Sequence, residues 1–307
     1  MKHEADACQT PRTRTPSVDG SAPTRTFCRM SPDLPRLTAL RYLQPLREGG
    51  SLPAVVDTEG GTFVVKFRGA GQGPKALVAE LVCAAIARAL QLPVPDLALV
   101  HVDPAFGASE PDPEIQDLLR ASHGTNVGIR YLDSAFNFAL SAAGDLIDAP
   151  VAAAIVWLDA FLTNPDRTPR NPNILVWERR PWLIDHGAAL YAHHDWRSVD
   201  AARTQTSFPI IRDHVLLPVA TEITSADMTL PSLLTPDVLH AALESVPDEL
   251  LNADAGVPEF ENAAAARARY VAYLEQRLAH RQAFVEEAER ARLRRRSQPP
   301  RHLQARR

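Results

Sequence analysis

The chain has 307 residues, of which 45% are hydrophobic and three are cysteine, and its formal net charge is −4. This length is enough for one large domain or for two lobes that share a cleft, and this hydrophobic content excludes a wholly disordered chain. The weak net charge excludes a global basic field for nucleic acids, no Cys-x-x-Cys pair marks a zinc or redox site, and no apolar run is long enough to span a membrane.

Residues 1–34 predict a disordered N-terminal arm, because they show no apolar periodicity and bury too little to offset the entropy of ordering. Residues 1–30 also lack the apolar core of a signal peptide. Together with the few cysteines, this predicts a protein of the reducing cytoplasm without a membrane partner. The abundance of Ala, Arg and Pro suggests a bacterial genome rich in G and C.

Residues 35–132 predict a small lobe that consists of an antiparallel sheet and one helix. Strand signals occur at residues 37–43, 54–56 and 63–67, and the last of these is a run of aromatic and β-branched side chains. A helix is predicted over residues 75–92, because apolar side chains recur along one face and two prolines follow.

Residues 133–289 predict a larger, helical lobe. The apolar, Ala-rich stretch 151–162 is typical of a buried helix. Residues 174–177 and 182–184 read as two short strands around a turn, so we expect a β-hairpin at the cleft face of this lobe.

Residues 290–307 are rich in arginine and predict a disordered, solvated tail. The alternative interpretation is a weak contact with an anionic partner such as nucleic acid. No other segment of the chain favours nucleic-acid binding.

Three polar residues have a spacing that points to chemistry. Asp166 is followed five positions later by Asn171, then by the predicted hairpin, and then by Asp185 in an Asp-x-Gly sequence. Phosphoryl transfer needs one carboxylate near the acceptor hydroxyl and oxygen ligands for Mg²⁺ beside the phosphates of ATP. Asp166 is the candidate for the first role, and Asn171 and Asp185 are candidate metal ligands.

The N-terminal half supplies candidates for binding phosphates. Lys66 lies near the end of the strand 63–67, and Glu80 on the following helix could pair with it. The sequence Gly49-Gly50-Ser51 lies between two strands, where glycine lets backbone N–H groups approach phosphate oxygens. Each signal alone is also typical of an exposed strand end or an ordinary turn, but their order along the chain together with Asp166 favours a phosphotransferase.

These motifs resemble the HipA-like kinase family. The Asp-x4-Asn and Asp-x-Gly sequences are similar to the kinase catalytic and metal loops, and the segment 46–53 also resembles this family. The Asp-Arg pair that begins the loop resembles that of phosphoinositide kinases. The likeness covers residues 37–250, and the longer toxins of the family carry an additional N-terminal subdomain where we expect only a short arm.

The resemblance implies a two-lobe, α+β, protein-kinase-like fold with ATP and Mg²⁺ as cofactors. Lys66 would neutralise the α- and β-phosphates, with Glu80 fixing its position. The adenine would lie near Tyr131 and Leu132, in the strand that links the lobes. His186 stands where protein kinases have a phenylalanine in the metal motif.

The phosphate acceptor has no motif, so three functions stay open. The first is a kinase acting on Ser or Thr of a protein. The second is a kinase acting on a small molecule or a lipid headgroup. The third is a nucleotide-binding pseudokinase that acts as an interaction module.

Four further polar residues near the motif have two interpretations each. Asn173 is an alternative metal ligand or a turn residue, and Arg167 and Arg170 contact phosphate or lie on a solvated loop face. Asp159, within the apolar helix, is a satisfied buried polar group or a residue that orients the catalytic loop.

Overall fold

The structure is a computed structural model that describes residues 33–46, 52–108, 110–252 and 259–297. The predicted N-terminal arm, except for its last two residues, and the Gly49-Gly50-Ser51 loop lie outside the described residues. So do residues 298–307 of the predicted tail.

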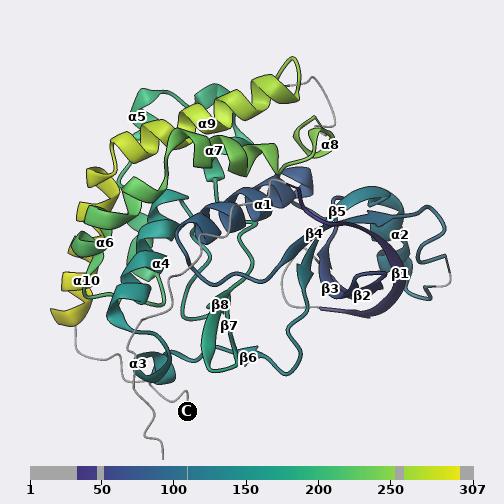
Figure 1. Ribbon diagram of the computed structural model, residues 1–307, viewed down its shortest axis with the longest axis horizontal. Helices are drawn as coiled ribbons and strands as arrows, with labels where there is room; N and C mark the ends of the chain where they lie inside the picture. The colour runs from purple at the N-terminus through teal and green to yellow at the C-terminus, as the bar shows by residue number, and fades with distance from the viewer. Residues whose placement is uncertain (1–32, 47–51, 109, 253–258, 298–307) are drawn as a thin grey trace, which may run out of the picture. The chain divides into compact units, whose positions relative to one another are not determined.

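Five strands of the N-terminal half close into a barrel in the order β1-β2-β3-β5-β4 (Figure 1). They are β1 (Arg36–Pro45), β2 (Ala54–Thr58), β3 (Gly61–Lys66), β4 (Leu97–Val102) and β5 (Gly124–Arg130). Their inward side chains form an apolar core. In this core, Phe63 and Val65 of β3 and Val100 of β4 are each exposed by 1% or less.

The predicted antiparallel sheet is wrong in one respect, because β1 pairs with β4 in parallel. The first residues of β1, Arg36 to Thr38, pair with β4, and the rest pairs with β2. Two irregularities in the β1–β2 register bend the strand between these partners, and a bend of this kind is what closing a sheet requires.

Helix α1 (Gly73–Ala89) follows β3 and has its whole central stretch, residues 77–87, buried. It contacts β5 on one side and α7 (Pro236–Glu244) and α8 (Asp248–Leu251) on the other. A helix enclosed in this way has apolar residues all round, which explains why the predicted helix 75–92 is so rich in Ala, Leu and Val. Helix α2 (Pro113–Ala121) places Ile115 and Leu119 in the barrel core.

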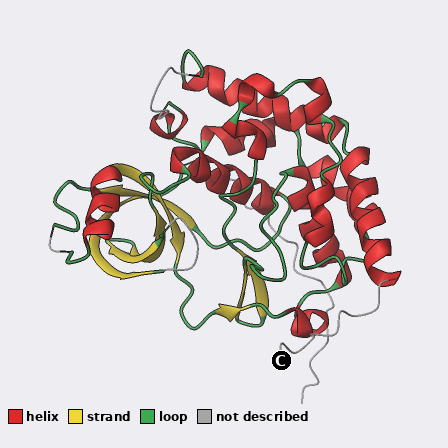
Figure 2. Cartoon of the chain, turned by 180° about the vertical axis from the view of Figure 1, so that it is seen from behind, coloured by secondary structure: helices red, strands yellow, loops and turns green. Residues whose placement is uncertain are grey.

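The second half of the chain is mainly helical and surrounds α4 (Ala149–Phe161), which is almost wholly buried. Figure 2 shows these helices in red, apart from the yellow strands of the barrel. The remaining α-helices are α3 (Ala143–Leu146), α5 (Ala201–Thr204), α6 (Ile223–Thr229), α9 (Ala263–Ala279) and α10 (Gln282–Ser297). Short 3-10 helices are η1 (Leu140–Ala142), η2 (Tyr191–His194), η3 (Trp196–Ser198), η4 (Pro209–Asp213) and η5 (Leu230–Leu233). Among the described residues, no helix combines the length and apolar character needed to cross a bilayer.

Helix α10 corrects the predicted start of the disordered tail at residue 290, because the helix continues to Ser297. Its apolar residues Phe284, Ala288 and Ala291 are buried. Ion pairs of i,i+3 spacing, such as Arg292 with Glu289 at 2.8 Å, run along the same helix. The arginines of this segment therefore belong to a packed helix rather than to a solvated chain.

A three-stranded sheet carries the predicted hairpin in the order β6-β7-β8. It consists of β6 (Phe136–Asn137), β7 (Ile174–Trp177) and β8 (Arg180–Leu183). The residues just outside the hairpin, Asn173 and Asp185, both have positive φ angles, 48° and 54°. Asn and Asp tolerate this conformation better than most residues.

Candidate active site

Lys66, at the end of β3, joins the two halves of the site through its ammonium group. Its Nζ donates to Glu80 Oε2 of α1 at 2.7 Å and to Asp185 Oδ1 at 2.5 Å. Lys66 and Glu80 are buried, whereas the Asp185 side chain is 41% exposed. The predicted ion pair between Lys66 and Glu80 is therefore present, and Asp185 extends it to the loop after β8.

The charges of Lys66 and Asp185 are stable at neutral pH. Burial alone would lower the pKa of Lys66, but the carboxylates of Glu80 and Asp185 raise it above its ordinary value. Burial acts to raise the pKa of Asp185, but the adjacent Lys66 ammonium holds it below its ordinary value. Glu80 Oε2 also accepts the backbone N–H of His186 at 2.8 Å, which ties α1 to the Asp-His-Gly sequence.

Asp166 lies in the loop between α4 and β7, where two amide side chains hold its carboxylate. Asn171 Nδ2 donates to Asp166 Oδ2 at 2.9 Å, and Asn173 Nδ2 lies 3.2 Å from the same oxygen. The backbone N–H of Asp166 donates to Asn164 Oδ1 at 3.1 Å. The carboxylate therefore has a fixed orientation while the residue stays partly exposed.

One cavity of about 1300 Å³ contains most of the predicted site residues. Lys66, Tyr131, Leu132, Asp166, Asn171 and Asp185 all line it. Glu80 is buried behind Lys66 and supports it from outside the cavity. Gly71 and Gln72, which precede α1, also line the cavity.

Apolar side chains from both halves of the described chain also line the cavity. Val64 and Ile129 come from β3 and β5 of the barrel, Ile174 begins β7, and Ile184 follows β8. A flat aromatic ring that lay against these side chains would remove apolar surface from water. Nothing in the sequence marked these residues, because isoleucine and valine in strands are ordinary core residues.

Asn171 and Asp185 offer the hard oxygen donors that Mg²⁺ prefers. Because Asn171 directs its Nδ2 to Asp166, its Oδ1 is the side-chain atom that would meet a metal ion. The exposed part of the Asp185 carboxylate lies in the same cavity. Mg²⁺ is usually bound through one or two protein side chains, with phosphate oxygens and water as its other ligands, so these two residues fit it.

The two interpretations of Arg167 are both wrong, because its side chain is fully buried and neither contacts the cavity nor faces solvent. Its Nε donates to Asp159 Oδ2 at 2.6 Å. Burial acts to raise the pKa of Asp159, but the Arg167 charge and a hydrogen bond from His214 lower it well below its ordinary value. Arg170, by contrast, is exposed and lines the cavity rim.

His186, in the Asp-His-Gly sequence, is buried and neutral at physiological pH, since burial lowers its pKa to about 4. Its Nδ1 lies 3.4 Å from Arg167 Nη2, so the neutral ring can accept a hydrogen bond there. His186 is thus a packed polar residue behind Asp185 rather than an acid or base in the cavity.

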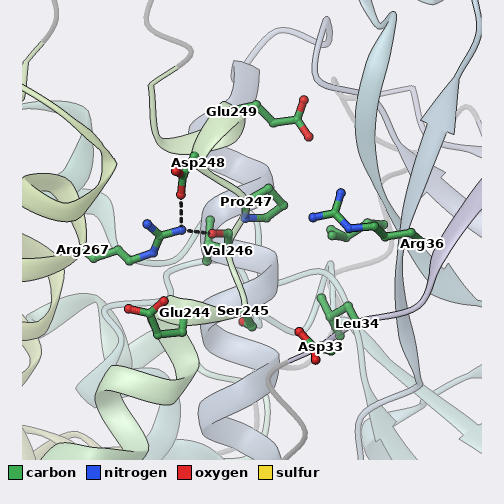
Figure 3. A pocket seen from close by; sticks show the side chains of 11 residues that line it. Asp33, Leu34, Arg36, Glu244, Ser245, Val246, Pro247, Asp248, Glu249 and Arg267 are labelled. Carbon is green, nitrogen blue, oxygen red and sulfur yellow. Dashed lines mark hydrogen bonds and ion pairs between the residues drawn. The ribbon is translucent and has the colours of Figure 1, made fainter.

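A second cavity of about 410 Å³ lies between the start of β1 and the segment from α7 to α9 (Figure 3). Its lining mixes both charges, with Asp33, Arg36, Glu244, Glu249 and Arg267. Arg267 already pairs with Asp248 at 2.6 Å and donates to the carbonyl of Val246 at 2.5 Å. This second cavity is lined by none of the predicted site residues.

Two solved kinase structures are similar to this chain. The Helicobacter pylori proinflammatory kinase CtkA has a TM-score of 0.50 at 12% identity, covering 87% of this chain and 100% of that chain, which shows a shared fold. The Golgi casein kinase with Mn/ADP bound has a TM-score of 0.42 at 12% identity, covering 83% of this chain and 73% of that chain, which is too weak a likeness to support an inference. No curated protein has a significant match to the sequence.

A family model described as HipA-like kinase matches residues 43–255, which is more than half of the chain. The match spans strand β3, which carries Lys66, the loop that carries Asp166, and the hairpin that precedes Asp185. The two-lobe α+β architecture predicted from the motifs is confirmed by the similarity to CtkA. The chain therefore belongs to the HipA-like kinase family and is a phosphotransferase with a kinase fold.

Proposed function

We propose that this kinase transfers the γ-phosphate of ATP, with Mg²⁺, to a Ser or Thr hydroxyl of a protein. The observation that carries the proposal is that Lys66, Asp166, Asn171 and Asp185 line one cavity, although they come from segments far apart in the sequence. This set contains a fixed cation, a held carboxylate and two oxygen donors, which are the parts that phosphoryl transfer uses.

The residues that line the cavity favour one orientation of a bound nucleotide. The adenine would lie between the apolar side chains near Tyr131 and Leu132, and the phosphates would extend toward Lys66. The Lys66 ammonium, held by Glu80, would contact the α- and β-phosphates without moving on binding. When bound, Mg²⁺ would neutralise charge on the phosphates, and Asn171 and Asp185 would hold it.

Asp166 would act on the acceptor. Its carboxylate would orient the acceptor hydroxyl and take its proton as the acceptor oxygen bonds to the γ-phosphorus. The bond between that phosphorus and the bridging β–γ oxygen breaks, and ADP leaves. The amides of Asn171 and Asn173 would keep the carboxylate aimed at the attacking oxygen throughout.

Incubation of the full chain with γ-labelled ATP and Mg²⁺ tests the proposal, with protein, lipid and small-molecule acceptors in separate reactions. We expect label on Ser or Thr of a protein, including the chain itself, and none without a divalent cation. Label on a lipid or a small molecule alone would replace the proposed acceptor class. Absence of transfer to every acceptor, with ATP still bound, would favour the pseudokinase alternative.

A further inference from the structure

One buried guanidinium connects the loop that carries Asp166 to the segment that carries Asp185. Arg167 Nη1 donates to the backbone carbonyl of Asn173 and lies 3.5 Å from that of Ile184. Residue 167 follows Asp166 directly, and Ile184 precedes Asp185 directly. One buried side chain, which does not line the cavity, therefore contacts the backbone beside both carboxylates.

A second buried residue anchors this guanidinium to α4. Asp159 Oδ2 accepts from Arg167 Nε at 2.6 Å and lies 2.9 Å from His214 Nε2, while Asp159 Oδ1 accepts from Asn164 Nδ2 at 2.9 Å. Asn164 in turn accepts the backbone N–H of Asp166. Asp159 therefore holds the catalytic loop on both sides of Asp166.

The chemistry of this position requires arginine. A guanidinium has donors in a rigid planar fork and can contact a carboxylate, two carbonyls and an imidazole at once, whereas an ammonium is a single point charge. Arg167 has all of these partners, and its own carbonyl accepts the N–H of Val215 at 2.9 Å.

We infer that Arg167, held by Asp159, is a positioning residue that fixes the distance between Asp166 and Asp185 for phosphoryl transfer. This inference rests on the proposed function for the roles of the two aspartates. The geometry of Arg167 does not depend on the proposed function, so the positioning role and the proposed function can be tested separately.

A second buried arginine provides a matched control. Arg277 of α9 has 1% exposure and donates to the carbonyls of Phe161 at 2.8 Å and Ala160 at 2.9 Å, at the C-terminal end of the same helix α4. Its other hydrogen bonds go to Thr204 and Thr206, outside the cavity. Arg277→Lys therefore carries the cost of replacing a buried arginine without touching the catalytic loop.

Hydrogen exchange of the full-length protein tests the geometry without any activity. In Arg167→Lys, amides of residues 164–174 and 183–187 should exchange at least about tenfold faster than in the wild type, because the contact between these segments is lost. Asn164→Ala keeps the buried charges of Arg167 and Asp159 paired, so this variant remains folded even if Arg167→Lys does not. In Asn164→Ala, only the amides of residues 164–174 should exchange faster. Unchanged exchange in these segments, or an equal increase in Arg277→Lys, would overturn the inference.

Phosphate transfer supplies the second measurement. In Arg167→Lys, kcat should fall on the order of 10²-fold, as expected for a misplaced catalytic group, with KM for ATP little changed and with Arg277→Lys near wild type. A kcat loss no larger than that of Arg277→Lys would overturn the positioning role. If the wild type transfers no phosphate, the proposed function fails, and the exchange measurement still decides whether Arg167 positions the two segments.

Discussion

At the scale of single residues, the site is an arrangement of charges that are each held by a partner. Lys66 lies between Glu80 and Asp185, at 2.7 and 2.5 Å, and the buried Glu80 receives a backbone N–H as well. A buried charge that keeps its partner is tolerated, but one that loses its partner is strongly destabilising. Lys66 therefore contributes to stability as well as to the proposed binding of phosphates.

Replacement of Lys66 by methionine should abolish phosphate transfer and also lower the free energy of unfolding by about 3 kcal/mol, because Glu80 would keep a buried charge without its main partner. Adding Glu80→Gln should recover part of the stability but none of the activity. Lys75→Met is the control, since the Lys75–Glu259 pair is more exposed. Urea unfolding and transfer assays measure both effects, and normal turnover in Lys66→Met would remove this lysine from the site.

A second residue-scale prediction concerns His193, which is buried against Tyr270. Burial, with the nearby charges of His194 and Lys75, lowers the pKa of His193 well below its ordinary value of 6.5. The unfolded chain therefore binds a proton at this site more readily, and stability is lost as the pH falls below that value.

In His193→Phe, the loss of stability between about pH 7 and about pH 5 should be smaller than in the wild type, because one histidine that resists protonation is gone. Urea unfolding at both pH values measures the difference. The same substitution at the exposed His240 is the control. An equal loss in His193→Phe and wild type would show that His193 titrates normally in the folded protein.

At the scale of elements, the sequence predicted what is local and missed what is joined across the chain. Asp166, Asn171 and Asp185 lie within twenty residues of one another, around one hairpin, so their spacing was visible in the sequence. The contacts of Arg167 were not visible in the sequence, because two of its partners are backbone carbonyls, which every residue has. The available signal was Asp159, a carboxylate in an apolar helix, which needs a cation partner nearby.

Helix α10 shows the same limit. Its arginines suggested a solvated tail from residue 290, yet Ala291 and Arg292 are buried and Arg295 Nη1 donates to the carbonyl of His214 at 3.0 Å. A charged surface on a helix hides the apolar face beneath it where that face is made of alanine, as it is at Ala288 and Ala291.

Truncation tests whether the end of α10 is structural. A chain that ends after Arg290 should be less stable than one that ends after Ser297 by about 1–3 kcal/mol, because it lacks the burial of Ala291 and the contact of Arg295 with His214. Urea unfolding measures the difference. Equal stability of the two chains would support the earlier sequence-based boundary at residue 290.

At the scale of the whole described chain, the family match, the similarity to CtkA and the cavity lead to one conclusion about class. The two-lobe architecture was predictable because the motifs resemble those of the HipA-like kinase family, which implies such a fold. The closure of the barrel was not, because the parallel pairing of β1 with β4 joins residues about sixty positions apart. The acceptor has no motif in the sequence, and it is therefore a question for the transfer experiment.

The central claim is that Asp166 serves the chemical step and Asp185 serves binding of the metal–nucleotide complex. Comparison of Asp166→Asn with Asp185→Asn tests it most directly, by kcat for phosphate transfer and by thermal stabilisation with ATP and Mg²⁺. We predict that Asp166→Asn lowers kcat on the order of 10²-fold or more while ATP and Mg²⁺ stabilise it like the wild type. Asp185→Asn should lose most of the metal-dependent stabilisation. Loss of affinity and turnover together in both variants, or normal kcat in Asp166→Asn, would contradict this division of roles.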